Sequence, residues 1–285
     1  MDDVIDTLRV AAKVCLVAWI FSTMLGMGLQ LKVREVLEPL RNAVLVTLAI
    51  IANYVLVPLL GYLILHFLPL SQGFRTGLVL AAVGAGAPFL PMLSEMSKGN
   101  RAWAAALMLL LTVATVVYMP LALPLLLTDV EVDPLAIARS LVLMLLPLVA
   151  GLFIRARNES LALHLTSLFG KTANITLIPT LALVVILGYP ELLHAVGRFG
   201  ILAAAILVLG GTAIGYVLGG PRRDMRVVLG FGTGSRNVAA ALAVAAQNFG
   251  NDPDVTLMCI LVTLAMVGLQ APLAKWLGRG ACSAA

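Results

Sequence analysis

A single arginine, Arg236, lies inside a long apolar stretch of this sequence, GFGTGSRNVAAALAVAAQ, which runs from Gly230 to Gln247. Its planar guanidinium group can bind a carboxylate or a sulfonate through two parallel hydrogen bonds. It can equally donate to backbone carbonyls at the end of a broken helix, where the helix dipole stabilises a positive charge. Both hypotheses stay open at this point, and they are compatible with one another.

Composition predicts that this arginine lies inside a membrane. Of the 285 residues, 61% are hydrophobic and 12% are charged, and a helix that crosses a bilayer needs about 20 mostly apolar residues. Nine such windows can be placed, at 10–31, 43–68, 75–97, 101–127, 135–154, 163–188, 197–219, 226–249 and 255–277. We therefore expect an all-α integral membrane protein, built as a single polytopic domain over residues 1–285.

An arginine at the centre of a membrane span is costly, by on the order of 2.5–3.5 kcal/mol on insertion scales. The other eighteen basic residues lie in loops or near the ends of spans, where a long side chain can carry its charge to water. Arg236 is therefore the strongest candidate for a functional residue in this chain.

Other kinds of chemistry have little support in the sequence. No His, Asp or Glu falls in the core of a span, so the residue pairs that a membrane-embedded enzyme needs are missing. Cys15, Cys259 and Cys282 do not have the spacing of metal ligands, and we expect neither a metal site nor a cofactor. The basic residues form no patch with aromatic residues, so we expect no nucleic-acid partner.

The distribution of charge predicts the orientation. Nine spans put the termini on opposite sides, with thirteen basic residues on one side, and five on the other together with the acidic loops TDVEVDP and GNDPD. Cytoplasmic loops are enriched in Lys and Arg, so we expect a multi-pass protein of the cell membrane with its N-terminus outside and its C-terminus in the cytoplasm. The acidic start, MDDVIDTLRVAAKV, is unlike a secretory signal, and we expect the first span to be retained.

A weak internal repeat is visible when the chain is shifted by 151 residues. The shift brings Arg75 onto Arg226, Gly99-Asn100 onto Gly250-Asn251, and LTVATV onto VTLAMV. The two copies, 10–127 and 135–277, are separated by an odd number of crossings, so they lie in opposite orientations. Inverted repeats are typical of secondary transporters, although chance similarity between two apolar stretches is an alternative.

Two spans of this repeat are interrupted in the middle. The third contains AVGAGAPFLPM, whose prolines remove backbone donors and clash with the preceding turn, and the eighth contains Gly230, Gly232 and Gly234. Each interruption alone could be an ordinary kink. Paired interruptions at matched positions indicate a transport site, because unwound backbone at membrane depth is tolerated where it lines a cavity or packs against protein.

Several segments together resemble the bile acid:sodium symporter family: MLGMGLQLK, NYVLVPLLGY, MSKGN and GFGTGSRNVAAALA. The likeness covers nearly the whole chain. It implies a panel and a core built from two inverted helix bundles, with two broken helices crossing in the core beside the substrate and sodium sites. Several members lack the first helix of the ten-helix plan, and nine spans fit that version.

This sequence departs from the family pattern at the positions that the resemblance assigns to sodium binding. The family's eighth-span motif is Glu-Thr-Gly-x-Gln-Asn, the third span carries a Ser-Asn pair, the fourth carries hydroxyl ligands and the second carries a glutamine. In the eighth-span motif this chain has Gly232 in place of the glutamate and Arg236 in place of the glutamine. Leu90 and Pro91 replace the Ser-Asn pair, Ala104 and Met108 align with the hydroxyl ligands, and Asn53 aligns with the second-span glutamine. Hard cations are held by cages of oxygen ligands, so the resemblance leaves sodium coupling in doubt.

The leading hypothesis is a secondary transporter of a small organic anion that works by alternating access, as a bile-acid-symporter-like protein in the lipid bilayer. A passive channel or a non-transporting membrane sensor with the same fold is the alternative. The residues expected to bind the substrate are Arg236, Asn237, Thr233, Gly234, Ser235, Pro88, Pro91, Asn53 and Thr112.

Overall fold

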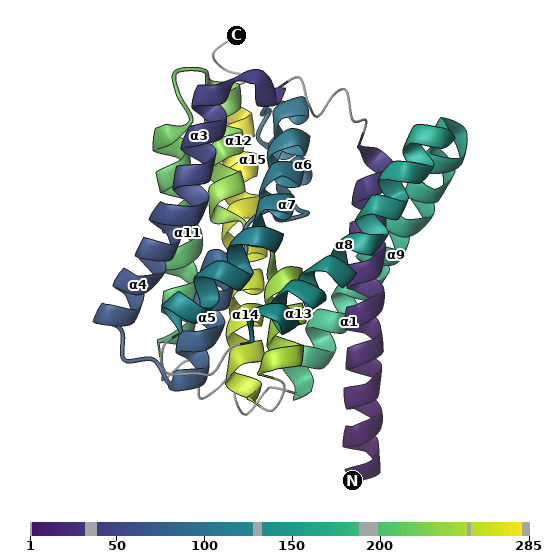
Figure 1. Ribbon diagram of the computed structural model, residues 1–285, viewed down its shortest axis with the longest axis vertical. Coiled ribbons are helices and arrows are strands. Elements are labelled where there is room, and N and C mark those ends of the chain that lie inside the picture. The colour runs from purple at the N-terminus through teal and green to yellow at the C-terminus, as the bar shows by residue number, and fades with distance from the viewer. Residues whose placement is uncertain (1, 32–38, 128–132, 188–198, 250–251, 281–285) are drawn as a thin grey trace. The chain divides into compact units, whose positions relative to one another are not determined.

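The computed structural model describes residues 2–31, 39–127, 133–187, 199–249 and 252–280, and the elements within these ranges are all helical (Figure 1). Six helical segments are long and apolar enough to cross a membrane: Ala43–Phe67, Arg101–Leu126, Pro134–Arg157, Gly200–Leu218, Arg223–Asn248 and Pro253–Arg279. The expectation of a multi-pass, all-α membrane protein is confirmed at this level. The acidic loop at 128–132, Gly250-Asn251 and Cys282 lie outside the described residues.

The chain divides into two compact units, which take helices from both halves of the sequence. Unit 1 consists of residues 1–33 and 142–197, and unit 2 of residues 34–141 and 198–285. The division therefore does not follow the boundary between the two expected repeats.

Unit 1 contains α1 (Asp2–Gln30), α9 (Glu159–Leu187) and most of α8 (Pro134–Arg157). α1 packs along α9, with Leu25, Leu29 and Ala162 buried between them. Where α1 passes α8, a side chain at Gly28 or at Gly151 would overlap the backbone of the other helix. Small residues at such a crossing allow close contact between helices in a membrane.

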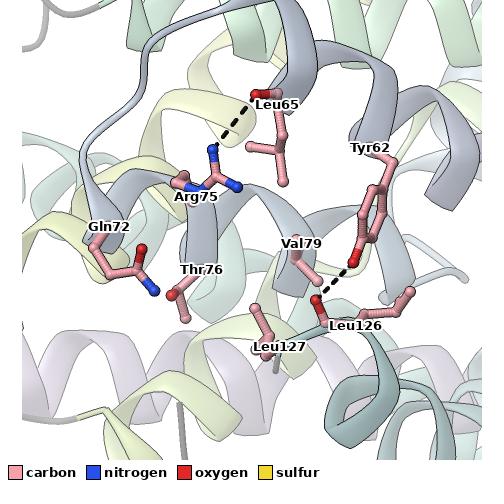
Figure 2. Close-up of a pocket in the computed structure, with 8 residues that line it drawn as sticks. All are labelled: Tyr62, Leu65, Gln72, Arg75, Thr76, Val79, Leu126 and Leu127. Carbon is pink, nitrogen blue, oxygen red and sulfur yellow. Dashed lines mark hydrogen bonds between the residues drawn. The ribbon is translucent and has the colours of Figure 1, made fainter. Parts of the chain in front are cut away.

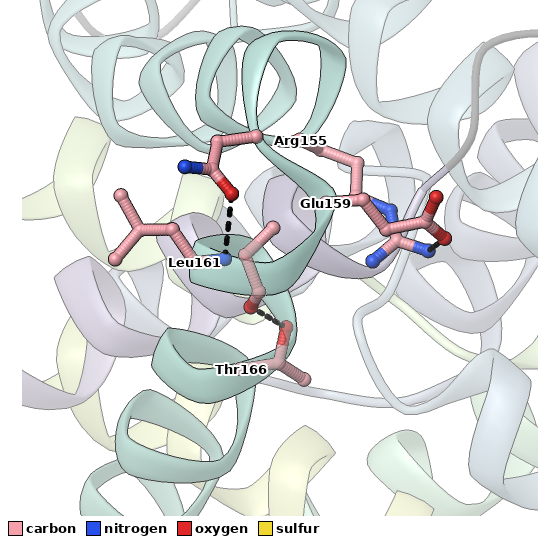
Figure 3. Close-up of polar contacts among 6 residues, drawn as sticks. Arg155, Glu159, Leu161 and Thr166 are labelled. Atoms are coloured by element: carbon pink, nitrogen blue, oxygen red, sulfur yellow. Dashed lines mark hydrogen bonds and ion pairs between the residues drawn. The ribbon is translucent and has the colours of Figure 1, made fainter.

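The turn between α8 and α9 is held by local polar contacts (Figure 3). Arg155 pairs with Glu159 at 3.0 Å, and Asn158 caps α9 by accepting from the backbone N–H of Leu161 at 2.9 Å. Arg155 and Arg157 lie in the last turn of α8, where positive charge is favourable. These contacts explain why one helix ends and the next begins within two residues.

Unit 2 contains the remaining helices. They are η1 (Pro39–Arg41), α3 (Ala43–Ile51), η2 (Ala52–Leu56), α4 (Val57–Phe67), α5 (Gln72–Val83), α6 (Leu90–Met96), α7 (Arg101–Leu126), α11 (Gly200–Leu218), α12 (Arg223–Gly234), α13 (Val238–Asn248), α14 (Pro253–Ala265), η3 (Met266–Gln270) and α15 (Ala271–Gly280). η2 and η3 are single π-helical turns that continue the α-helices on either side of them.

The first broken helix is α5–α6, and its interruption lies where the sequence predicts it. Residues 84–89 are not helical. Gly86 has a φ of +87°, which side-chain-bearing residues rarely adopt. Pro88 lies in the turn that follows, but Pro91 belongs to the first turn of α6, where proline needs no backbone partner. The prediction that Pro91 lies in the unwound stretch is therefore wrong.

The second broken helix is α12–α13, and its interruption lies further along the chain than the glycines indicate. α12 runs through Gly230 and Gly232 to Gly234, and the non-helical residues are 235–237. The glycines serve close packing instead. A side chain at Gly234 would overlap Thr212 of α11, which packs along α12.

The two broken helices cross at their interruptions. α5 packs against α13, and α6 packs against α12, so the two helices run in opposite directions, as Figure 1 also shows. The backbone N–H of Asn237 donates to the carbonyl of Gly84 at 2.8 Å, which joins one interruption directly to the other.

Candidate functional site

The candidate site lies at the crossing, where α5 and α12 both end. The last carbonyls of a helix have no partner within the helix, and they give its C-terminal end a partial negative charge. Two such ends meet at this point inside the protein. Their arrangement favours a cation between them.

Arg236 supplies that cation. Its side chain is fully buried (0% exposed). From the end of α5 it binds two carbonyls, with Nε donating to Ala81 at 3.1 Å and Nη2 to Ala82 at 2.7 Å. From α12 it binds the carbonyl of Thr233, to which Nη1 donates at 2.9 Å. The guanidinium group therefore joins the ends of both half-helices.

Asn53 completes the set of acceptors around the arginine. Its Oδ1 accepts from Arg236 Nη1 at 3.0 Å, and its Nδ2 donates to the carbonyl of Ala49 and to the Thr233 hydroxyl at 3.0 and 3.2 Å. The orientation of the amide is thereby fixed. Asn53 lies in the π-helical turn η2, and such turns are frequent at functional sites because they re-aim side chains.

A second series of hydrogen bonds between polar side chains starts at Ser235. The Ser235 hydroxyl donates to Gln270 Oε1 at 2.7 Å, and Gln270 Nε2 donates to the Thr212 hydroxyl at 3.0 Å. All three side chains are buried. Gln270 lies in the other π-helical turn, η3, so each π turn sends one amide side chain to the second interruption.

Asn237 has one polar group in use and one free. Its Oδ1 caps α13 by accepting from the backbone N–H of Ala240 at 3.1 Å. Its Nδ2 is buried and has no hydrogen-bond partner among the residues that the structure describes. A buried donor without a partner costs about 1–3 kcal/mol, so this amide is prepared to bind an acceptor that the described residues do not supply.

The first interruption has no polar side chains of its own, and α7 holds its backbone. The Thr112 hydroxyl donates to the carbonyl of Gly86 at 3.0 Å, and the Thr115 hydroxyl contacts both the N–H and the carbonyl of Ala85 at 3.1 Å. Tyr54, from η2, contacts Thr115 at 3.1 Å. Thr112 therefore acts on the backbone of the interruption.

The expected site residues fall into three groups. Arg236, Asn53 and Thr233 form one hydrogen-bonded cluster, and Ser235 and Asn237 flank it in the chain. Thr112 holds the other interruption, and Gly234 provides space for Thr212 and Gln270. No polar contact joins Pro88 or Pro91 to the arginine cluster among the described residues.

Apart from Asn53 and Arg236, the positions that the resemblance aligns with the family's sodium ligands carry no polar side chain. A Cβ at Gly232 would lie 2.7 Å from Leu107 Cδ2 and 3.1 Å from Leu90 Cδ2. Leu90, Ala104 and Met108 are all buried. Among the described residues, the space directly beside Gly232 is therefore occupied by the side chains of Leu107 and Leu90.

Sequence reasoning missed Tyr54, Gln270 and Thr115. Each is a buried polar residue in an apolar span, and that pattern is the signal that could have found them. Within the described ranges no group of three or more His, Cys, Asp or Glu side chains could hold a metal. Cys15 and Cys259 are free thiols in the same ranges.

Comparison with known proteins identifies the family. Residues 17–194 match the family model described as the sodium bile acid symporter family. Probable sodium/metabolite cotransporter BASS3 of Arabidopsis thaliana, a chloroplastic protein, is 27% identical over 264 residues, which cover 90% of this chain and 61% of the relative. Probable sodium/metabolite cotransporter BASS2 of rice, Oryza sativa subsp. japonica, also chloroplastic, is 27% identical over 267 residues, which cover 90% of this chain and 62% of that relative.

The chain thus spans less than two thirds of the length of these relatives. The matched segment includes α3 to α9 and the first interruption, with η2 and its Asn53. Together with the earlier resemblance in the second interruption, this match shows that the chain belongs to the sodium bile acid symporter family.

Proposed function

We propose that this protein is a secondary transporter that carries a small organic anion across the cell membrane by alternating access. Membership of a symporter family supports transport rather than catalysis. Two relatives carry the name sodium/metabolite cotransporter. The crossing of α5–α6 with α12–α13 supports a transport site at membrane depth, because irregular backbone persists there where it lines a cavity or packs against protein.

The proposed architecture has nine spans arranged as inverted repeats, 10–127 and 135–277, with unit 1 as panel and unit 2 as core. The interruptions begin at Gly84 and Ser235, and the offset between them is the 151 residues of the sequence repeat. The opposite directions of the two broken helices also support inversion.

The orientation with the N-terminus outside follows from the distribution of basic residues. A cysteine introduced at Val130 should react with an impermeant thiol reagent from outside intact cells, whereas one at Arg157 should react after permeabilisation only. The reverse pattern of labelling would overturn the orientation. A background without the native cysteines, Cys15, Cys259 and Cys282, keeps the labelling specific.

We further propose that Arg236 takes the place of a coupling cation, so that transport does not require sodium. The observation that carries this proposal is the buried guanidinium group with four hydrogen bonds to Ala81, Ala82, Thr233 and Asn53. A fixed positive charge already neutralises the ends of α5 and α12. A sodium ion at the same place would be repelled by the arginine.

The same geometry supports a structural role for Arg236 over direct contact with the anion. Four of its donors are bound to protein oxygens, and a guanidinium group has five N–H donors in total. We assign the substrate contact to the free amide of Asn237 and to backbone donors exposed at the interruptions in other states of the transport cycle.

Uptake into sealed proteoliposomes tests both proposals. The proteoliposomes are loaded with an unlabelled anion, and the same anion with a radiolabel is added outside, for a panel of carboxylates and sulfonates. The outside buffer contains sodium, potassium or choline at constant ionic strength, and the accumulated label is measured. We expect counterflow of at least one anion that is equal in the three salts. Strong stimulation by sodium would overturn the proposed role of Arg236 and leave the transport function standing.

A passive channel or a non-transporting sensor would behave differently in this assay. A channel equilibrates label without the transient overshoot of counterflow, and a sensor binds the anion without moving it. Either result would overturn the transport function, because counterflow requires a carrier that alternates between the two sides.

A further inference from the structure

A cavity of about 110 Å³ lies at the opposite end of α5 from the crossing. Figure 2 shows the residues that line it. Its walls come from α4, from the first turns of α5 and from the end of α7. The lining residues are Tyr62, Leu65, Gln72, Arg75, Thr76, Val79, Leu126 and Leu127. From Arg75 to Ala82 the helix rises about 10 Å, so the cavity is distinct from the Arg236 cluster.

Arg75 is the charged residue of this cavity and is only weakly engaged. Its Nη1 donates to the carbonyl of Leu65 at 3.4 Å, which is long for a hydrogen bond. The remaining N–H donors of this half-buried side chain have no partner among the described residues. Asp252 and Asp254 lie near the same end of α5 but against Gly73, and they do not line the cavity.

Arg226 occupies the position that the 151-residue repeat matches to Arg75, and its environment is different. Its Nε donates to the carbonyl of Gly220 at 3.0 Å, and its guanidinium group lies 5.2 Å from the centre of the Tyr216 ring. The chain itself therefore covers the charged group of Arg226. The side chain of Arg75 borders the cavity instead.

Two neutral polar side chains accompany Arg75. Gln72 and Thr76 lie on the same helix, and Figure 2 shows them on the cavity wall beside Arg75. An amide and a hydroxyl group can both donate to an anion. The Tyr62 hydroxyl is occupied, because it donates to the carbonyl of Leu126 at 3.1 Å. Leu65, Val79 and Leu127 make the other walls apolar.

We propose that this cavity binds the anionic oxygen group of a carboxylate, sulfonate or phosphate, with Arg75 as its bidentate donor and Gln72 and Thr76 as additional donors. A guanidinium fork matches two oxygens of such a group. A water molecule needs about 10–15 Å³ of such space, so 110 Å³ admits a head group of several heavy atoms. No acidic side chain of the described residues lines the cavity, which favours anions over cations.

Two sources can supply this chemistry, a free small anion and the phosphate of a membrane lipid. Two measurements on the full chain in neutral detergent distinguish them. The first follows thermal unfolding during titration with acetate, methanesulfonate or inorganic phosphate at constant ionic strength. The second counts bound phosphatidylglycerol and phosphatidylcholine by native mass spectrometry.

Arg75→Gln removes the charge and keeps an amide of similar length, and Arg222→Gln is the matched control. Arg222 is an exposed arginine of the same unit and does not line this cavity. In one of the two measurements we expect the wild-type chain and Arg222→Gln to bind the probe saturably. Arg75→Gln should bind the same probe with an affinity lower by roughly tenfold or more, because it loses a hydrogen bond to a charged group.

Thr76→Val is the second variant, since it keeps the shape of the side chain and removes the hydroxyl donor. It should lower the affinity in the same measurement, by a smaller factor than Arg75→Gln. Equal binding of every probe by wild type, Arg75→Gln and Thr76→Val would overturn the proposal, as would the absence of saturable binding in both measurements.

Discussion

The two helix interruptions differ in what they contribute to the site. The first, residues 84–89, contains only Gly, Ala, Pro and Phe, and other elements hold its backbone through Thr112 and Thr115. The second, residues 235–237, consists of Ser, Arg and Asn. The side chains of Ser235 and Arg236 reach other helices, and Asn237 caps the helix that follows.

Two interruptions at matched positions of the proposed repeat therefore need not carry the same chemistry. The first offers carbonyl acceptors, and the second supplies the donors that bind them. One arginine serves the negative ends of both half-helices. Four variants test this division of roles, beginning with the one that should have the largest effect.

Arg236→Gln should destabilise the chain most. It leaves the carbonyls of Ala81, Ala82 and Thr233 buried without their donor, and removal of one partner from a buried charged network costs about 3–5 kcal/mol. Thermal unfolding in detergent measures the loss, with Arg222→Gln as the control for one lost charge. An unchanged unfolding midpoint would show that the arginine does not hold the crossing together.

Gly234→Leu should abolish uptake and lower stability by a smaller amount. The new side chain would overlap Thr212 and displace Gln270, which would separate α12 from α11. Overpacking of this kind costs about 1–3 kcal/mol. Gly268→Leu is the control, because nothing lies within 4 Å of a Cβ at that position. Normal uptake by both variants would mean that close packing at Gly234 does not matter for transport.

Ser235→Ala should have a moderate effect that depends on Gln270. The variant leaves Gln270 Oε1 without the hydroxyl that it now binds at 2.7 Å, at a cost of about 1–3 kcal/mol for a buried acceptor. Replacing Gln270 by leucine as well should restore part of the loss, because both polar partners are then gone. Strictly additive losses in a double-mutant cycle would contradict a direct coupling.

Rebuilding the family motif should have the smallest effect, measured as the stimulation of uptake by sodium. Gly232→Glu with Arg236→Gln rebuilds the family motif in sequence, yet Leu90 and Leu107 occupy the space beside residue 232. We expect uptake by this double variant to stay insensitive to sodium, and a response to emerge once Leu90→Ser supplies space and an oxygen ligand. Sodium stimulation of the double variant alone would show that the leucines are no obstacle.

The helices could be predicted from sequence because their apolar windows are long and typical capping residues mark their ends. Asn42, Ser71 and Asn100 cap helices in the structure, as residues of these types commonly do. The glycines predict the second interruption too early in the chain, because glycine can mark unwinding or close packing. At Gly234 it marks close contact between helices, and only the neighbouring helix distinguishes the two meanings.

The polar cluster could be predicted in part. The residue types and the family pattern are enough to predict that Arg236 and Asn53 belong to the site. Their pairing at 3.0 Å joins residues 183 positions apart in the chain, which no local pattern encodes. The polar types of Tyr54 and Gln270 in apolar spans are visible in the sequence, but the π turns η2 and η3, which aim these side chains, leave no clear signal there.

A cation that is part of the chain also has an energetic consequence for the proposed cycle. Arg236 returns to its starting place after each cycle and moves no net charge, so in a cycle without a coupled ion the substrate alone carries charge across the membrane. A potential of 100 mV is worth about 2.3 kcal/mol per elementary charge, which corresponds to a concentration ratio of roughly 40 to 50 at equilibrium. With a negative cell interior, the voltage itself would drive a monovalent anion outward.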